Sequence, residues 1–195
     1  LVSEQIESVI CYGRGEQTTD ANVYKTCGEY YSKMNNLLSR FTGLMYGGCG
    51  LSTRRLISVI EKEKPDVVHV HCINGYFVNV YRFMDWLKKS GIPTVLTLHA
   101  EFMHTGNCAH AYDCEGWKNG CGNCPVFKRE TKSLFKDNTA LSWQKMKSAF
   151  EGFEKLVVVS VSPWLMGRAQ QSPIFGDFKH KVVLNGLNTD IFKPC

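Results

Sequence analysis

Five short apolar runs recur along the chain, and stretches with helical patterns separate most of them. The runs are rich in β-branched residues, and most lack the alternation of apolar and polar residues that marks a sheet with one wet face. Strands of this kind that alternate with helices predict right-handed crossovers and a doubly wound, mostly parallel sheet. We therefore expect an α/β, Rossmann-like fold. The predicted strands cover residues 7–13, 66–72, 94–99, 155–162 and 181–186.

Three of the intervening stretches carry clear helix signals. Residues 52–65 begin with Ser52 or Thr53 as a candidate N-cap. Residues 76–91 end in lysines followed by a glycine, as the helix dipole and the C-cap favour. Residues 138–153 carry apolar side chains at helical spacing, which predicts a face in the core rather than a membrane or cofactor surface. That stripe consists of Trp143, Met146, Phe150 and Phe153.

The composition is that of a globular protein with one large domain. The chain has 195 residues, enough to bury roughly 70% of the surface that it exposes when unfolded. Its net charge of +5 is modest and does not indicate a nucleic-acid partner. No apolar run approaches the roughly 18 residues that span a bilayer. No signal-peptide pattern and no N-x-Ser/Thr sequon is present in the sequence, which favours a cytoplasmic location.

Residues 128–155 form a basic and partly aromatic stretch. Such a stretch is compatible with an anionic substrate, or with a peripheral contact to anionic lipid at the inner face of the membrane. A solvated helix face is the simpler explanation.

Ligands of doubly wound sheets bind beyond the carboxyl ends of the strands. His99 ends a predicted strand, where it can hydrogen-bond a sugar hydroxyl or a phosphate, or act as a base; a hydrogen bond within its own loop is the alternative. His69 and His71 share one face of the preceding strand, and His71 lies nearer the ligand edge. The segments at this edge are residues 13–15, 69–75, 99–101, 160–162 and 185–186.

Four cysteines cluster with the spacing C-x5-C-x6-C-x2-C. The last pair, in "NGCGNCP", resembles a knuckle whose glycines permit the tight turn of a tetrahedral thiolate site. Four thiolates would fill the coordination shell of zinc and leave no place for water, so we expect a structural zinc rather than a catalytic one. Two disulfides or four free thiols are the alternatives, and a catalytic site would have to recruit His104 or His110. The predicted ligands are Cys108, Cys114, Cys121 and Cys124.

Several segments together resemble the family-four retaining glycosyltransferases, in their colanic-acid and capsule-type branch. They are "PDVVHVH", "TLHAEFMHTGNCAHAYDCEGWKNGCGNCP", "VSVSPWLMGRAQQS" and "VVLNGLNTDIFKP", in this order. The resemblance implies a GT-B fold, of which residues 1–186 would be the N-terminal, acceptor-side domain. Residues 104–127 would be a Cys-rich insertion, and residues 187–195 would begin the interdomain linker. The first strand of the family and its glycine-rich loop do not match this sequence, and the donor-binding C-terminal domain lies outside it.

The resemblance also implies an activity and a set of site residues. The whole enzyme would move a hexose from a nucleotide-diphosphate sugar to a glycan or lipid-linked acceptor in surface polysaccharide synthesis, without a catalytic metal, and this part alone would be inactive. His99 matches the family histidine that reaches the donor sugar, but Ala100 stands where the family often has Asp, and Glu101 follows. The implied catalytic residues are therefore His99 and Glu101. The implied substrate contacts are His71, Asn74, Gly75, Tyr76 and Thr105, together with Asn185 and Gly186 of the interdomain segment.

Two other kinds of function fit parts of the sequence. A zinc-knuckle module that binds nucleic acid would explain the cysteines, but the insertion lacks the interleaved arginine and aromatic residues that such binding uses. A non-catalytic sugar-binding domain is not distinguishable by sequence from one half of a transferase.

Overall fold

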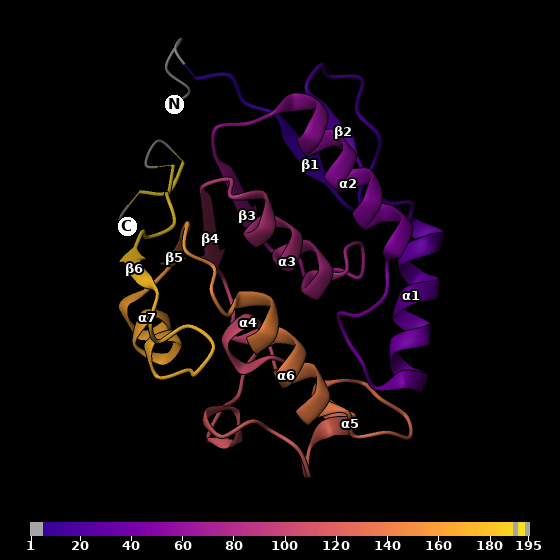
Figure 1. The fold of residues 1–195 in the computed structure, drawn as a ribbon, viewed down its shortest axis with the longest axis vertical. Helices are drawn as coiled ribbons and strands as arrows, with labels where there is room; N and C mark the ends of the chain where they lie inside the picture. The colour runs from indigo at the N-terminus through magenta and orange to yellow at the C-terminus, as the bar shows by residue number, and fades with distance from the viewer. Residues whose placement is uncertain (1–5, 189–190, 194–195) are drawn as a thin grey trace.

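Four parallel strands form the central sheet, in the order β3-β4-β5-β6 (Figure 1). A computed structural model describes residues 6–188 and 191–193. The register pairs Val70 with Leu96, and Leu96 with Val158, so buried aliphatic residues run across the middle of the sheet. The parallel sheet with helices between its strands confirms the predicted α/β, Rossmann-like class. The strands are β3 (Val68–His71), β4 (Thr94–Leu98), β5 (Leu156–Ser160) and β6 (Lys179–Val182).

A second sheet contains only β1 (Ile10–Tyr12) and β2 (Val23–Lys25), which are also parallel. Within the described residues, no strand pairing joins this sheet to the central one. The predicted strand over residues 7–13 is therefore real but shorter than expected. The sequence pattern did not predict β2, because three residues with no apolar run around them give no periodic signal.

Five longer helices connect and cover the strands (Figure 1). They are α1 (Glu29–Thr42), α2 (Gly50–Glu63), α3 (Val80–Ser90), α6 (Thr139–Phe150) and α7 (Pro163–Gln170). The short elements α4 (Phe102–Thr105), η1 (Gly116–Lys118) and α5 (Phe127–Glu130) lie between β4 and α6. None of the helices that the structure describes is long and apolar enough to cross a bilayer.

Two helix starts differ from the prediction. Helix α2 begins at Gly50, with Cys49 as its N-cap in the left-handed region at φ 65°. The hydroxyls of Ser52 and Thr53 donate to the Cys49 carbonyl, so neither residue is the cap. Helix α3 begins at Val80 and not at residue 76, because the Asn79 side chain accepts a hydrogen bond from the Arg82 amide and caps the first turn.

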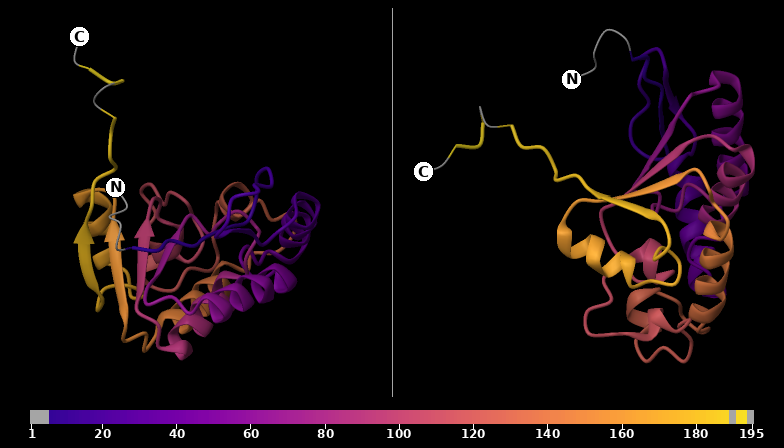
Figure 2. Two further views of the ribbon diagram at one scale, coloured as in Figure 1. Left: turned by 90° about the horizontal axis from the view of Figure 1, so that it is seen from above. Right: turned by 60° about the vertical axis from the view of Figure 1, so that its left-hand side comes forward.

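One hydrophobic core joins the helices to the central sheet. Helix α3 packs on α6, and α7 packs on β5 and β6. The stripe predicted on the helix over residues 138–153 is buried in this core, with exposed fractions of 0% for Met146 and Phe150. Aromatic edge contacts extend the packing, as in the Phe150–Phe175 pair at 4.8 Å between ring centroids. The segment after β6 leaves the body of the molecule (Figure 2).

Candidate functional site

Two histidines meet at the carboxyl edge of the central sheet. His71 is the last residue of β3, and His99 directly follows β4. Because the strands are parallel neighbours, both side chains reach the same edge, and His71 Nδ1 lies 3.1 Å from His99 Nε2. Both residues are exposed. The structure thus brings together two residues that were selected from the sequence because ligands of doubly wound sheets bind beyond the carboxyl ends of the strands, which we call the strand-end rule.

A third histidine, His69, lies next to His71 on β3. His69 Nε2 lies 2.8 Å from Thr97 Oγ1, and its ring centroid is 4.0 Å from that of His71. Burial lowers the pKa of both His69 and His71, and the neighbouring histidines lower the pKa values further. A neutral imidazole has one donor and one acceptor nitrogen. The edge therefore offers ring nitrogens that can orient a hydroxyl group at neutral pH.

An open cavity of about 530 Å³ adjoins His71. The loop after β1 contributes Gly13, Arg14 and Gly15 to its wall, and the loop after β3 contributes His71 and Gly75. Gly13 has no room for a side chain, since a Cβ there would lie 1.9 Å from Cγ of the Phe77 ring. The wall also includes the Glu29 carboxylate, which pairs with Arg14 at 3.0 Å. Paired charges, an imidazole and glycine backbone form a wall suited to a polyhydroxylated ligand.

Among the other predicted contact residues, only some lie near this cavity. Asn74 is exposed and Tyr76 is half-buried, and each is next to Gly75 in the chain. Asn185 and Gly186 are exposed and lie on the segment that follows β6. That segment extends away from the helices (Figure 2).

Glu101 has a different environment from the one that a catalytic carboxylate needs. It is 1% exposed, and its oxygens accept hydrogen bonds from the Ala111 amide at 2.8 Å and from Arg168 Nε at 2.8 Å. His104 Nε2 lies 3.4 Å from the same carboxylate. Thr105 is also fully buried and donates to the Cys108 carbonyl. These contacts favour a bracing role over the predicted catalytic role of Glu101 and over the predicted substrate contact of Thr105.

Arg168 connects this carboxylate to the Cys-rich insertion. Its guanidinium carbon lies 4.9 Å from the centroid of the Trp117 ring, and its Nη1 lies 3.5 Å from a Glu115 oxygen. Trp117 is 1% exposed, and the Trp143 indole donates to its carbonyl at 2.7 Å. Helix α7, η1 and α6 are thereby joined through buried side chains. The sequence pattern missed Arg168 and Trp117, because contacts across 50 or more residues leave no local signal.

The cysteine cluster does not form the predicted metal centre. In the part of the chain that the structure describes, no three His, Cys, Asp or Glu residues are placed to hold a metal ion. Cys114 is exposed, whereas Cys121 is half-buried with its sulfur 3.8 Å from the Thr105 carbonyl. The knuckle is held by other means, since the Cys124 amide donates to Asp137 Oδ2 and the Gly122 amide donates to Thr139 Oγ1. The geometry does not support zinc, and hydrogen bonds and tryptophan packing hold this loop.

The Glu101 environment predicts a distinct dependence of stability on pH. Burial alone raises the pKa of Glu101, but hydrogen bonds from His104, the Ala111 amide and Arg168 outweigh it and lower the pKa to about 2. Because the unfolded chain has a pKa near 4.3, the unfolded state binds more protons between these values. We expect a stabilisation on the order of 3 kcal/mol that is present above pH ~4.5 and is lost as the pH falls toward 2.

Urea denaturation at a series of pH values measures this profile. Burial also lowers the pKa of His104, so a smaller loss of stability begins below pH ~6.5. The Glu101→Gln variant should show a flatter profile below pH ~4.5. Equal slopes for both proteins in that window would show that Glu101 carries no such shift.

Comparison with known proteins gives one similarity. The chain is 42% identical over 74 residues to the Escherichia coli K12 protein described as "Putative colanic acid biosynthesis glycosyl transferase WcaC". The match covers 35% of this chain and 18% of that protein. No protein-family model matches the chain, and no solved structure does. The site thus lies in an α/β chain with a partial similarity to a glycosyltransferase of colanic acid synthesis, over about a fifth of that protein's length.

Proposed function

We propose that this chain is the acceptor-side domain of a larger retaining glycosyltransferase. The enzyme would move a hexose from a nucleotide-diphosphate sugar to a glycan or lipid-linked acceptor in surface polysaccharide synthesis. The partial identity to a glycosyltransferase of colanic acid synthesis carries this proposal. The parallel sheet with an open carboxyl edge supports it, because ligands of such sheets bind at that edge.

The histidine pair supplies the chemistry of the proposed site. His99 would contact the transferred sugar, and His71 would hold the His99 ring through the 3.1 Å contact between their nitrogens. The acceptor would lie in the cavity between the loop after β1 and residues 71–76. Asn185 and Gly186 would belong to the segment that leads to the donor-binding domain.

Glycosyl transfer passes through an oxocarbenium-like transition state. Two things must then be provided: stabilisation of the charge on the departing diphosphate, and close placement of the acceptor hydroxyl. Under this proposal the donor-binding domain provides the first, and the domain described here provides the second. The ion pair of Glu101 and Arg168 holds the segment that follows His99.

The test is a transfer assay with the full-length protein from which this chain derives. The protein is incubated with a set of labelled nucleotide-diphosphate hexoses and with lipid extract as acceptor. Incorporation of label from one donor, with retained anomeric configuration, supports the proposal. No incorporation from any donor, together with salt-sensitive binding of single-stranded oligonucleotides, would replace it with the nucleic-acid module.

A further inference from the structure

Helix α1 presents its apolar residues to solvent and its polar residues to the protein. Tyr30 is 83% exposed, and Leu37 and Leu38 are 54% and 52% exposed. The buried residues of the same helix are Ser32, Asn35 and Ser39. We propose that this outer face of α1 is a membrane-docking surface that binds bilayers containing anionic phospholipid. The inference does not depend on the glycosyltransferase proposal.

The outward orientation of the apolar face is fixed by hydrogen bonds on the inner face. The Ser32 hydroxyl donates to the Gly75 carbonyl at 3.0 Å, and Asn35 Oδ1 accepts from the Cys49 amide at 2.8 Å. Gly48 lies so close to Asn35 that a Cβ there would be 2.6 Å from Asn35 Oδ1. Rotating α1 to bury its apolar face would break these buried bonds, so the exposure is built into the fold.

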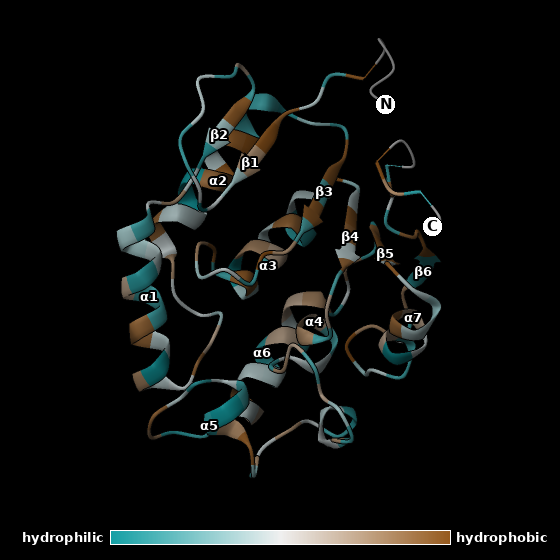
Figure 3. Ribbon diagram, turned by 180° about the vertical axis from the view of Figure 1, so that it is seen from behind, coloured by the Kyte–Doolittle hydropathy of each residue, from teal (hydrophilic) through white to brown (hydrophobic). Residues whose placement is uncertain are grey.

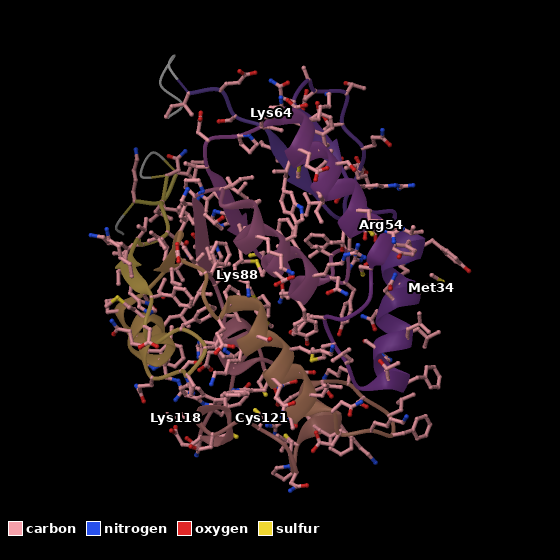
Figure 4. All side chains as sticks on the ribbon, viewed as in Figure 1. Met34, Arg54, Lys64, Lys88, Lys118 and Cys121 are labelled. Atoms are coloured by element: carbon pink, nitrogen blue, oxygen red, sulfur yellow. The ribbon has the colours of Figure 1, made fainter. Side chains whose placement is uncertain are left out.

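The apolar positions form one continuous strip. Residues 30, 34, 37, 38 and 41 follow the i, i+4, i+7, i+8, i+11 spacing of a single helix face. Met34 lies on α1 at the outer margin of the molecule (Figure 4). The hydropathy colouring shows hydrophobic segments along α1 among hydrophilic ones (Figure 3). A helix of this length gives a strip of roughly 20 Å.

A neighbouring loop extends the strip at the end of α1. The Leu134 amide donates to the Arg40 carbonyl at 2.8 Å, and the rings of Phe41 and Phe135 are stacked at 6.1 Å. Phe135 is 72% exposed and Leu134 is 44% exposed. This loop, residues 132–136, belongs to the basic stretch noted in the sequence, and all of its residues except Ser133 are exposed.

Positive charge borders the apolar strip. The exposed cations are Lys33, Arg40, Lys132 and Lys136, and none of them forms an ion pair with another described residue. A concavity of about 290 Å³ beside the strip is lined by Arg14, Ser32, Lys33, Asn36, Leu37 and Arg40. Of the cations that line it, Arg14 pairs with Glu29, whereas Lys33 and Arg40 are in none of the ion pairs among the described residues, which suits the phosphate of a lipid headgroup.

These features favour a bilayer over another protein. An apolar strip flanked by cations is the arrangement of helices that lie in the membrane interface. A second copy of the chain docked on this strip would bring a second set of the same cations into the contact, and that accumulation of like charge is unfavourable. The C-terminal segment departs at the side of the molecule opposite α1 (Figures 1 and 2).

The test is flotation of the full-length protein with vesicles of phosphatidylglycerol and phosphatidylcholine, or of phosphatidylcholine alone. Wild type should bind the anionic vesicles, and high salt should weaken the binding. Replacing Leu37, Phe41 and Phe135 by serine should reduce the bound fraction by about tenfold or more. The Lys33→Glu, Arg40→Glu variant should reduce it by a similar factor on anionic vesicles only.

Matched controls separate this surface from general hydrophobicity and charge. Val67 and Val183 are 53% and 59% exposed on other parts of the molecule, and replacing both by serine should leave binding unchanged. The Lys145→Glu, Lys155→Glu variant is the control for charge. Equal binding by all variants would overturn the proposal. The proposal would also be overturned if wild type binds no vesicles and instead forms a concentration-dependent dimer in sedimentation, and the serine variant does not form that dimer. If the protein binds vesicles but transfers no sugar, the membrane-docking proposal is retained.

Discussion

Replacing Arg168 by methionine is expected to lower the free energy of unfolding by about 3 to 5 kcal/mol. The side chain is 16% exposed, and its partner Glu101 is 2% exposed, so the variant leaves a buried carboxylate without its cation. The Ala111 amide and the nearby His104 ring do not supply the positive charge that is lost. The stacking of the guanidinium on Trp117 is lost as well. Urea denaturation followed by tryptophan fluorescence measures the loss.

A surface ion pair provides the matched control. Arg129 pairs with Glu130, and its own side chain is 63% exposed. Arg129→Met should change the free energy of unfolding by no more than about 0.5 kcal/mol, because exposed pairs contribute little. Adding Glu101→Gln to Arg168→Met should recover part of the loss, since the unpaired charge is then removed. A loss for Arg168→Met as small as that for Arg129→Met would show that the brace is not a main source of stability.

Strands β3, β4 and β5 could be predicted because each carries its own apolar signal, whereas β6 covers Lys179–Val182 and overlaps the predicted strand over 181–186 only at its end. The runs before His71 and His99 are apolar and β-branched, and they form β3 and β4 close to the predicted bounds. The strand-end rule then brought His71 and His99 to one edge without any knowledge of distances. Helix α1 was not predicted although its apolar residues have helical spacing, because its N-cap is Gly28, which provides no capping side chain to mark its start. The spacing also does not show that the apolar face is the exposed one.

The brace and the cysteine cluster show where sequence patterns stop being informative. Glu101 follows a strand end and so resembles a site residue, but its partner Arg168 lies 67 positions further along the chain. Burial at that position depends on how α7 packs, which no local pattern encodes. The cysteine spacing indicated zinc through the knuckle alone. The loop instead takes its shape from the side chains of Asp137, Thr139 and Trp143, which hydrogen-bond its backbone at Cys124, Gly122 and Trp117.

Replacing His99 by alanine is expected to lower kcat/KM for sugar transfer by the full-length protein by about 100-fold or more. This follows from the proposed contact between His99 and the transferred sugar. The exposed ring is held at 3.1 Å from His71 and has no core contact to lose, so the variant should fold. Initial rates at varied donor concentration separate kcat from KM, and the loss should fall mainly on kcat if the contact strengthens in the transition state.

His110 supplies the matched control, because it is an exposed histidine in the Cys-rich insertion whose ring lies 6.2 Å from that of Tyr112. His110→Ala should keep kcat/KM within about twofold of wild type, since surface substitutions away from a site have little effect. His71→Ala should give an intermediate loss, because His99 keeps its ring but loses the nitrogen that orients it. If His99→Ala and His110→Ala have equal activity, the carboxyl edge of β4 is not where the sugar is held. The search for the site would then move to the cavity wall formed by Arg14 and the loop after β1.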